Sequence, residues 1–177
     1  MHVLITGPRG VGKSTLIRRV IAELGCPVFG FETKKEDAPE GELRGSPVYI
    51  YPAGEEHRRS EENLVGICQN RHIATCPGAF DRFAPRLRAP VPAGHIVLMD
   101  EIGTLESASQ AFCSAVLTLL DGNTPVIAAV KDKSTPFLDT VKAHPNGTLF
   151  SITEENRDAL FDEVLAFLRQ QLTQKKT

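Results

Sequence analysis

Eight residues near the beginning of the sequence constrain the fold more than any other segment. They match the pattern G-x-x-x-x-G-K-[ST] and read Gly7-Pro8-Arg9-Gly10-Val11-Gly12-Lys13-Ser14. An apolar run over residues 3–6 precedes them, and residues 13–24 carry apolar side chains at helical spacing. A buried strand, a glycine-rich turn and a helix in this order are typical of a phosphate-binding loop. The sequence therefore predicts a polyphosphate site at the carboxyl end of the first strand.

The parts of this loop have separate roles in holding a nucleotide. Glycines let successive backbone N–H groups point at phosphate oxygens, and the helix that begins at Lys13 directs its positive end toward them. We expect the loop and Thr15 to bind the nucleotide, with Lys13 on the β- and γ-phosphates and the Ser14 hydroxyl on Mg²⁺. Lys13 is also expected to assist catalysis. Arg9 is expected to point outward, because such a loop binds through its backbone.

Two carboxylates, Asp100 and Glu101, follow a second apolar run at 96–99. This run is expected to form a strand beside the loop strand, and the carboxyl ends of parallel strands meet at one edge of a sheet, which places the pair on the Mg²⁺ side of the phosphates. We expect Asp100 to serve Mg²⁺, directly or through water, and Glu101 to orient or activate a water molecule. A solvated turn would explain the pair taken alone, and the phosphate loop favours the site. A carboxylate directed at water also favours hydrolysis over phosphoryl transfer.

Strands and helices alternate along much of the chain. Apolar runs predict further strands at 28–32, 126–130 and 149–152, and apolar stripes predict two further helices. One helix is expected from about Ser107 to Gly122, and the other from a cap at Thr153. This order predicts an α/β fold of the P-loop type, with three layers around a mainly parallel sheet.

The segment from about residue 36 to 94 departs from this pattern and holds seven of the twelve prolines. Within it, Pro47–Tyr51 is a predicted strand and one arm of a hairpin that begins at Phe29. The segment has too few apolar residues for a core of its own. We therefore expect residues 1–177 to form a single domain, in which this segment is an inserted hairpin that serves as a lid or a partner surface.

Composition excludes several classes of function. The 177 residues include 20 basic and 22 acidic side chains, and the pI of about 6.2 argues against a dedicated nucleic-acid binder. Apolar runs are too short for a membrane span, and the first residues show no leader pattern, so a cytoplasmic location is expected. Neither the four cysteines nor the five histidines have the spacing of a transition-metal site.

Several motifs together resemble a known family. These are Gly7–Thr15, Gly30-Phe31-Glu32-Thr33, Gly41–Ile50, Asp100-Glu101-Ile102-Gly103 and Thr153–Leu160 with its Asn156-Arg157-Asp158 core. They resemble the thermophilic- and cancer-related nucleoside-triphosphatases, small P-loop proteins of the additional-strand, catalytic-glutamate division. This resemblance implies Mg²⁺-dependent hydrolysis of ATP, GTP and other NTPs with little base discrimination. The family commonly continues D-E-I-G with Lys-Met-Glu, whereas this chain has Thr104-Leu105-Glu106.

Four further residues are weaker candidates, each with a second explanation. Lys131 follows the 126–130 strand and is expected either near the γ-phosphate or the base, or in a solvated turn. Arg157 either flanks the base or simply belongs to a first helical turn stabilised by its neighbours. Arg82 and Arg86 lie four residues apart, so they form either a lid that neutralises γ-phosphate charge or a solvated helix face.

The combined prediction is a Mg²⁺-dependent nucleoside triphosphatase with slow turnover, because the sequence contains no clear arginine finger. Two alternatives stay open at this point. A small-molecule or nucleotide kinase would use the 36–94 segment as a lid over its acceptor. A nucleotide-dependent binding switch would use hydrolysis only to reset contact with a protein partner, which the sequence does not identify.

Overall fold

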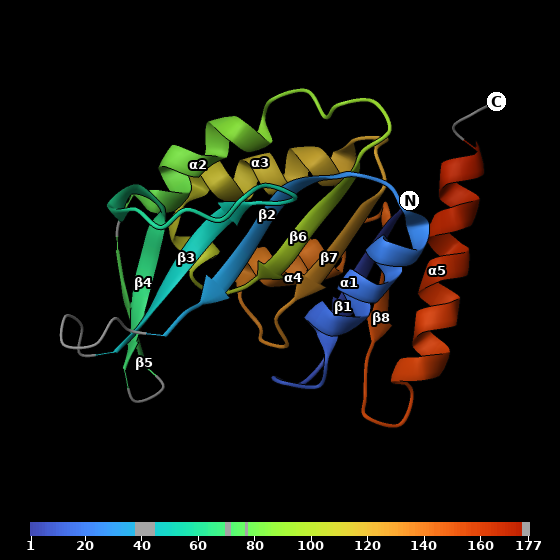
Figure 1. Cartoon of the computed structure of the whole chain (residues 1–177), viewed down its shortest axis with the longest axis horizontal. Helices are drawn as coiled ribbons and strands as arrows, with labels where there is room; N and C mark the ends of the chain where they lie inside the picture. Colours follow the sequence, from blue (N-terminus) through green and yellow to red (C-terminus); the bar gives the residue numbers. More distant parts are fainter. Residues whose placement is uncertain (38–44, 70–71, 77, 175–177) are drawn as a thin grey trace.

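The computed structural model describes residues 1–37, 45–69, 72–76 and 78–174, and these contain one eight-stranded sheet (Figure 1). The strands are β1 (His2–Thr6), β2 (Val28–Lys35), β3 (Ser46–Pro52), β4 (Leu64–Gln69), β5 (His72–Thr75), β6 (Ile96–Ile102), β7 (Val126–Val130) and β8 (Gly147–Ser151). Their order in the sheet is β5-β4-β3-β2-β6-β7-β1-β8.

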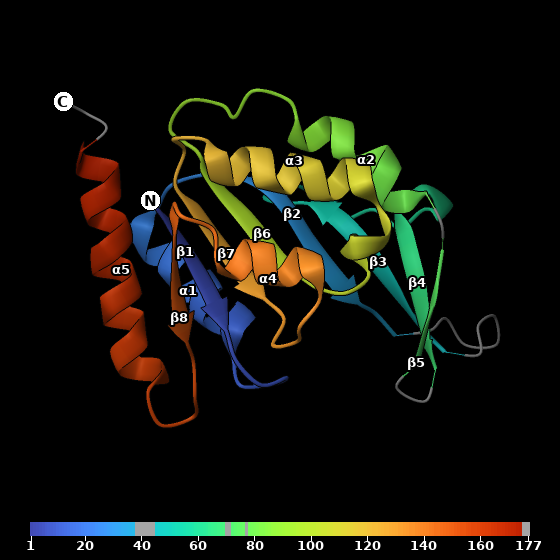
Figure 2. The ribbon, with the colours of Figure 1, turned by 180° about the vertical axis from the view of Figure 1, so that it is seen from behind.

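The helices are α1 (Lys13–Leu24), α2 (Ala79–Leu87), α3 (Gln110–Asp121), α4 (Pro136–Lys142) and α5 (Arg157–Gln174). Two helices, α1 and α5, cover one face of the sheet, and α2, α3 and α4 cover the other (Figures 1 and 2). A separate apolar core fills each interface, one built around Ile17 and Val164 and the other around Phe31 and Phe112. The predicted three-layer architecture is confirmed.

Five neighbouring strands, β2, β6, β7, β1 and β8, run parallel to one another. The predicted strands at 3–6 and 126–130 are confirmed to within one residue, as is the helix over 13–24. These two strands are buried on both faces, which explains why they appear in the sequence as short unbroken apolar runs. The strand β7 separates the loop strand β1 from β6, the strand that carries Asp100, so the expectation that β6 lies directly beside β1 is wrong.

The segment from 36 to 94 is more regular than expected. The hairpin of β2 and β3 is confirmed, with Phe31 opposite Pro52 and Lys35 opposite Val48. Regular structure also continues beyond the expected hairpin, because β4 and β5 extend the same sheet and α2 packs against α3. The strands β4 and β5 are short and show no clear period in the sequence. The apolar residues Phe80, Phe83, Ala84 and Leu87 of α2 do have helical spacing, and Pro85 within the helix is the residue that argues against it in the sequence. Part of the Gly41–Ile50 motif, residues 41–44, lies outside the described residues.

Two helices begin later than predicted. α3 begins at Gln110, because the Ser109 hydroxyl accepts a hydrogen bond from the Phe112 N–H and caps the helix there. The regular part of α5 begins at Arg157, one turn after Thr153, and the predicted cap at Thr153 is present as a capping box with Asn156. In that turn the Thr153 hydroxyl accepts from the Asn156 N–H, and the Asn156 amide oxygen accepts from the Thr153 N–H. α4 is an additional helix that the sequence patterns do not predict.

Another difference concerns the two carboxylates of the predicted site. Asp100 and Glu101 lie within β6 instead of after it, because pairing with β7 continues past them. Asp100 is opposite Ala129 and Ile102 is opposite Val130, so the register shifts at Glu101. Within the described ranges, no helix is both long enough and apolar enough to cross a lipid bilayer.

Candidate active site

The phosphate loop connects β1 to α1 and leaves the first turn of α1 available to a ligand. The helix is capped by Gly12 at a φ of 109°, with no side-chain cap, so the N–H groups of its first turn have no side-chain acceptor there. Gly7 has a φ of +154°, and a Cβ atom at this position would lie 2.5 Å from the Ile152 carbonyl oxygen. The glycines therefore allow both the curvature of the loop and its close approach to the end of β8.

Lys13 is buried beneath this loop. Its Nζ atom donates to the carbonyl oxygens of Gly7 at 2.9 Å and Pro8 at 3.1 Å, and lies 3.4 Å from Oε1 of Glu101. These contacts hold the ammonium group inside the curve of the loop, where a phosphate chain would be enclosed. Arg9 is exposed, as expected for a loop that binds through its backbone.

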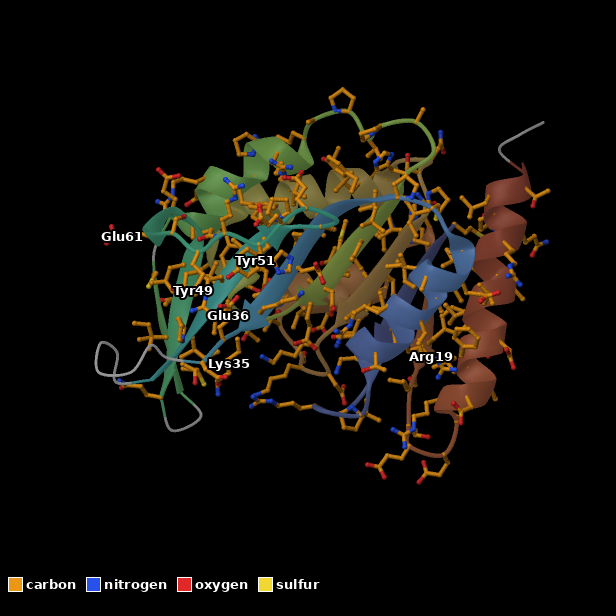
Figure 3. The ribbon with its side chains drawn as sticks, in the orientation of Figure 1. Arg19, Lys35, Glu36, Tyr49, Tyr51 and Glu61 are labelled. Carbon is orange, nitrogen blue, oxygen red and sulfur yellow. The ribbon has the colours of Figure 1, made fainter. Side chains whose placement is uncertain are left out.

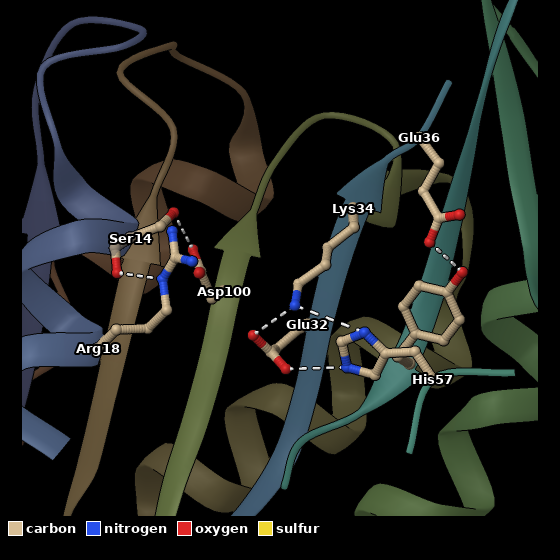
Figure 4. A network of polar contacts seen from close by, with 8 residues as sticks. Ser14, Arg18, Glu32, Lys34, Glu36, His57 and Asp100 are labelled. Carbon is tan, nitrogen blue, oxygen red and sulfur yellow. Dashed lines mark hydrogen bonds and ion pairs between the residues drawn. The ribbon is translucent and has the colours of Figure 1, made fainter. Parts of the chain in front are cut away.

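The structure brings Ser14 and Asp100 together, as expected for a magnesium site. The Ser14 hydroxyl donates to Oδ1 of Asp100 at 2.8 Å (Figure 4). Among the described residues, no three His, Cys, Asp or Glu side chains are arranged to enclose a metal ion by themselves. A hydroxyl and a carboxylate are nevertheless hard oxygen ligands, which suit Mg²⁺ when phosphate oxygens and water complete its coordination. The residues present therefore fit this ion.

The electrostatic environment of Asp100 is unfavourable to its charge in the absence of a cation. Burial raises the pKa of Asp100, and the nearby charges of Glu32 and Glu101 act in the same direction. The hydrogen bond from Ser14 and the positive charge of Arg18 oppose this rise. A divalent cation at this position would offset the repulsion between the carboxylates.

Glu101 contacts Lys13 from the strand that carries Asp100, and its side chain is 36% exposed. The residue before it, Asp100, is buried, so the two neighbours have different environments. A partly exposed carboxylate next to the lysine of the phosphate loop can accept a proton from water, whereas the buried one is placed for the metal. The roles of metal ligand for Asp100 and of base for Glu101 stay predictions.

Glu106 is a buried acid for which the sequence predicts no role. Its Oε2 accepts from the Gly103 N–H at 2.9 Å, which closes the turn after β6. Burial raises the pKa of Glu106 to about 7. Its place shortly after the D-E-I-G motif is visible in the sequence, but its burial depends on the path of the turn.

Substituting Glu106 should change how stability depends on pH. Between the ordinary pKa of 4.5 and the folded-state pKa of about 7, the folded protein retains a proton that the unfolded chain loses. The free energy of unfolding should therefore fall with rising pH across this range, by about 3 kcal/mol in total from this group. Glu106→Gln, which keeps an acceptor for Gly103, should lose that contribution. Urea unfolding at several pH values tests this, and the same pH dependence in both proteins would contradict it.

A cleft of about 360 Å³ lies between the phosphate loop, Pro8–Val11, and the turn Thr153–Glu155. This turn is held by Asn156, whose amide group donates to the Ser151 carbonyl oxygen. Asn156 therefore has the stabilising role that was one of the two explanations of this motif. Arg157 is exposed at the beginning of α5, shortly after the turn that borders the cleft. Its contact with a base stays a prediction.

The structure places the remaining candidates in different regions. The Lys131 N–H donates to the Ile102 carbonyl oxygen, and its charged group lies close enough to Glu106 to lower the pKa of that acid. Lys131 is thus near the turn that follows Glu101. In contrast, Arg82 donates to the Glu62 carbonyl oxygen, and Arg86 pairs with Glu55. Both arginines lie on α2, away from the phosphate loop, so the structure does not support a lid role for them.

Sequence reasoning also missed a polar group beside Asp100. Glu32 on β2 is paired in register with Asp100 and contacts both Lys34 and His57 (Figure 4). In the sequence Glu32 is visible only as part of the Gly30–Thr33 motif, which assigns it no role. The contact between His57 and Glu32 depends on the path of the chain after β3, which no local pattern predicts.

A phosphate loop after β1, two carboxylates on β6 and a strand between these two together define a P-loop NTPase fold. A family profile described as NTPase matches residues 2–165, so the chain belongs to this family. Nucleoside-triphosphatase THEP1 of Thermotoga maritima is 31% identical, with 96% of each chain covered. A cancer-related nucleoside-triphosphatase homolog of Mus musculus is 32% identical, with 97% of this chain and 98% of the other covered. The resemblance inferred from the motifs is confirmed.

Solved structures support the same fold. The crystal structure of THEP1 from the hyperthermophile Aquifex aeolicus matches with a TM-score of 0.73 and 24% identity, over 95% of this chain and 99% of the other. The solution structure of a human cancer-related nucleoside triphosphatase matches with a TM-score of 0.64 and 26% identity, over 96% and 97% of the two chains. The predicted P-loop α/β fold is confirmed.

Proposed function

We propose that the protein is a Mg²⁺-dependent nucleoside triphosphatase that converts NTP and water to NDP and phosphate. The observation that carries this proposal is the convergence of four side chains at one edge of the sheet. Ser14 bonds to Asp100 at 2.8 Å, and Lys13 lies 3.4 Å from Glu101. Membership of the NTPase family supports the same conclusion.

Each side chain has a distinct task in this proposal. Lys13 and the N–H groups of residues 7–15 hold the phosphates, and Ser14 and Asp100 hold Mg²⁺. When bound, Mg²⁺ neutralises charge on the β- and γ-phosphate oxygens. Glu101 orients a water molecule toward the γ-phosphate and accepts its proton. The bond between the water oxygen and the γ-phosphorus forms as the bond between the γ-phosphorus and the oxygen that bridges to the β-phosphate breaks. That bridging oxygen leaves with the NDP.

The proposal extends to substrate range and rate. We infer that ATP, GTP and other NTPs are all substrates, since the phosphate loop binds the triphosphate group, which is the same in all of them. The cleft beside Thr153–Glu155 is proposed to receive the base, with Arg157 at its border. Turnover is proposed to be slow, on the order of 10⁻⁴ to 10⁻² per second, as in P-loop enzymes without an arginine finger. An approach of Lys131 to the γ-phosphate or the base stays part of the proposal.

We also infer that the chain works as one nucleotide-binding domain in the cytoplasm. In support of the single domain, β2 pairs with β6 on one side and with β3 on the other, so the elaborated segment continues the sheet of the nucleotide core.

Phosphate release from purified protein tests the proposed function. Incubation with ATP, GTP, CTP or UTP and Mg²⁺ should release phosphate from all four, and EDTA should stop release. NTP consumption that requires a metabolite and yields a phosphorylated product would establish a kinase instead. A protein partner that binds the NTP-bound form tightly and dissociates after hydrolysis would identify a binding switch.

A further inference from the structure

A row of side chains crosses three neighbouring strands beside the phosphate loop. Asp100 on β6 is paired with Glu32 on β2, and Glu32 is paired with Tyr51 on β3. Paired residues on adjacent strands project from the same face of a sheet. Glu32 therefore lies next to Asp100, on the face to which α1 brings Ser14.

The carboxylate of Glu32 is held at both oxygens. Oε1 lies 3.3 Å from Nζ of Lys34, and Oε2 lies 3.2 Å from Nε2 of His57 (Figure 4). The other ring nitrogen of His57, Nδ1, faces Nζ of Lys34 at 3.5 Å. An ammonium group only donates, so Nδ1 is the acceptor and Nε2 carries the proton given to Glu32. These contacts fix the direction of the carboxylate.

His57 is itself positioned by an aromatic support. Its ring stacks on Tyr51 at a centroid separation of 4.2 Å and an interplanar angle of 7°. The Tyr51 hydroxyl donates to Glu36 at 2.5 Å, and Figure 3 shows this residue pair on the β2–β3 hairpin. Because Tyr51 is almost fully buried, the stack holds the chain segment after β3 over Glu32. Lys34 and His57 therefore orient the Glu32 carboxylate, and Tyr51 in turn holds the His57 ring in place.

This arrangement places the carboxylates of Glu32 and Asp100 side by side, with little exposure to solvent. The Glu32 side chain is 12% exposed, and Asp100 is buried. Lys34 offsets the negative charge of Glu32. Within the described residues, neither Lys34 nor His57 has a hydrogen bond or ion pair with Asp100. Repulsion between neighbouring buried carboxylates is costly unless a cation lies close to both. The hydrated cation proposed at Ser14 and Asp100 meets this requirement.

We propose that Glu32 is a positioning residue of the metal–nucleotide site, which binds water ligands of the cation beside Asp100 and is oriented by Lys34 and His57. Mg²⁺ usually keeps several water ligands, and such waters need acceptors of their own. The proposal rests on the function proposed above, because it concerns the same cation.

Metal affinity, measured apart from catalysis, tests this role. Mn²⁺ replaces Mg²⁺ as an octahedral oxygen-ligated probe, and its binding is followed by electron paramagnetic resonance with a saturating non-hydrolysable NTP analogue. Glu32→Gln should raise the Kd for Mn²⁺ by about 10- to 100-fold, the usual effect of losing an outer-sphere partner. Affinity for the analogue in EDTA should stay within about twofold of the wild-type value, because the N–H groups of the phosphate loop are unchanged.

Two further variants separate this role from a structural one. His57→Phe keeps an aromatic ring over Tyr51 and removes the donor to Glu32. It should therefore raise the Kd for Mn²⁺, by a smaller factor than Glu32→Gln does. Glu61→Gln makes the same chemical change at an exposed position before β4, outside this network, and should leave Mn²⁺ affinity unchanged. Thermal unfolding of each variant shows whether the fold persists.

Unchanged Mn²⁺ affinity in folded Glu32→Gln would overturn the proposal, as would an equal loss of analogue binding in EDTA. Phosphate release by the wild-type protein, measured in the same series, distinguishes failure of the role of Glu32 from failure of the proposed function. If the wild-type protein hydrolyses NTP and Glu32→Gln binds Mn²⁺ normally, only the role of Glu32 fails. If the wild-type protein releases no phosphate, the proposed function fails whatever the metal data show.

Discussion

Glu101→Gln should lower the rate of NTP hydrolysis by about 100- to 10,000-fold while nucleotide binding persists. The expected loss is that of a general base, because glutamine cannot accept the proton from the attacking water. Binding should be equal or tighter, since the substitution removes a negative charge that lies 3.4 Å from Lys13. Phosphate release under saturating NTP and equilibrium binding of a fluorescent analogue measure the two effects separately.

A matched control is available for this substitution. Glu61→Gln makes the same chemical change at an exposed position before β4, far from the phosphate loop, and should hydrolyse NTP at the wild-type rate (Figure 3). Unchanged phosphate release in Glu101→Gln, with binding intact, would remove Glu101 from the mechanism. The water would then have to be oriented by another group.

Lys13→Ala should weaken NTP binding about 10- to 100-fold and reduce hydrolysis below detection. Each charge-assisted hydrogen bond contributes about 1.5–3 kcal/mol, and Lys13 is the buried cation of the loop. Its removal also takes away charge that stabilises the transition state, so hydrolysis should fall by more than binding. Calorimetric titration with a non-hydrolysable NTP analogue and phosphate-release assays check the two parts.

Arg9→Ala provides the control for the lysine substitution. Arg9 lies in the same loop and has the same formal charge, but it is exposed, and the loop is expected to bind through its backbone. Its removal should change NTP affinity by less than about threefold, the effect of a screened surface charge. Equal losses in both variants would indicate that general attraction between charges, and not the placement of Lys13, governs binding.

The parts of the site that sequence reasoning identified are those set by local chain geometry. The loop at 7–14 requires glycines, a lysine and a hydroxyl at fixed spacing, so it can be recognised from one short segment of the sequence. Asp100 and Glu101 follow an apolar run of ordinary strand length, which placed them at the correct edge of the sheet. Even here the predicted end of β6 was wrong, because continued pairing with β7 depends on a distant neighbour, as in the pair Asp100 and Ala129.

The parts that were missed depend on contacts between distant segments. The role of Glu32 requires the register between β2 and β6 and the path that brings His57 over Tyr51. Neither is encoded in a periodic pattern. The burial of Glu106 arises from the turn at Gly103, and a carboxylate in a turn is ordinarily solvated. The late beginnings of α3 and α5 have a similar origin, because serine and threonine near helix ends suit several capping positions.

The central claim is that water, and no other acceptor, attacks the γ-phosphate at this site. Hydrolysis of NTP in ¹⁸O-labelled water, with mass spectrometry of the products, tests it most directly. One phosphate is expected for each NDP formed, with one oxygen of each phosphate derived from the labelled water and no label in the NDP. Consumption of NTP without an equal yield of labelled phosphate would contradict it.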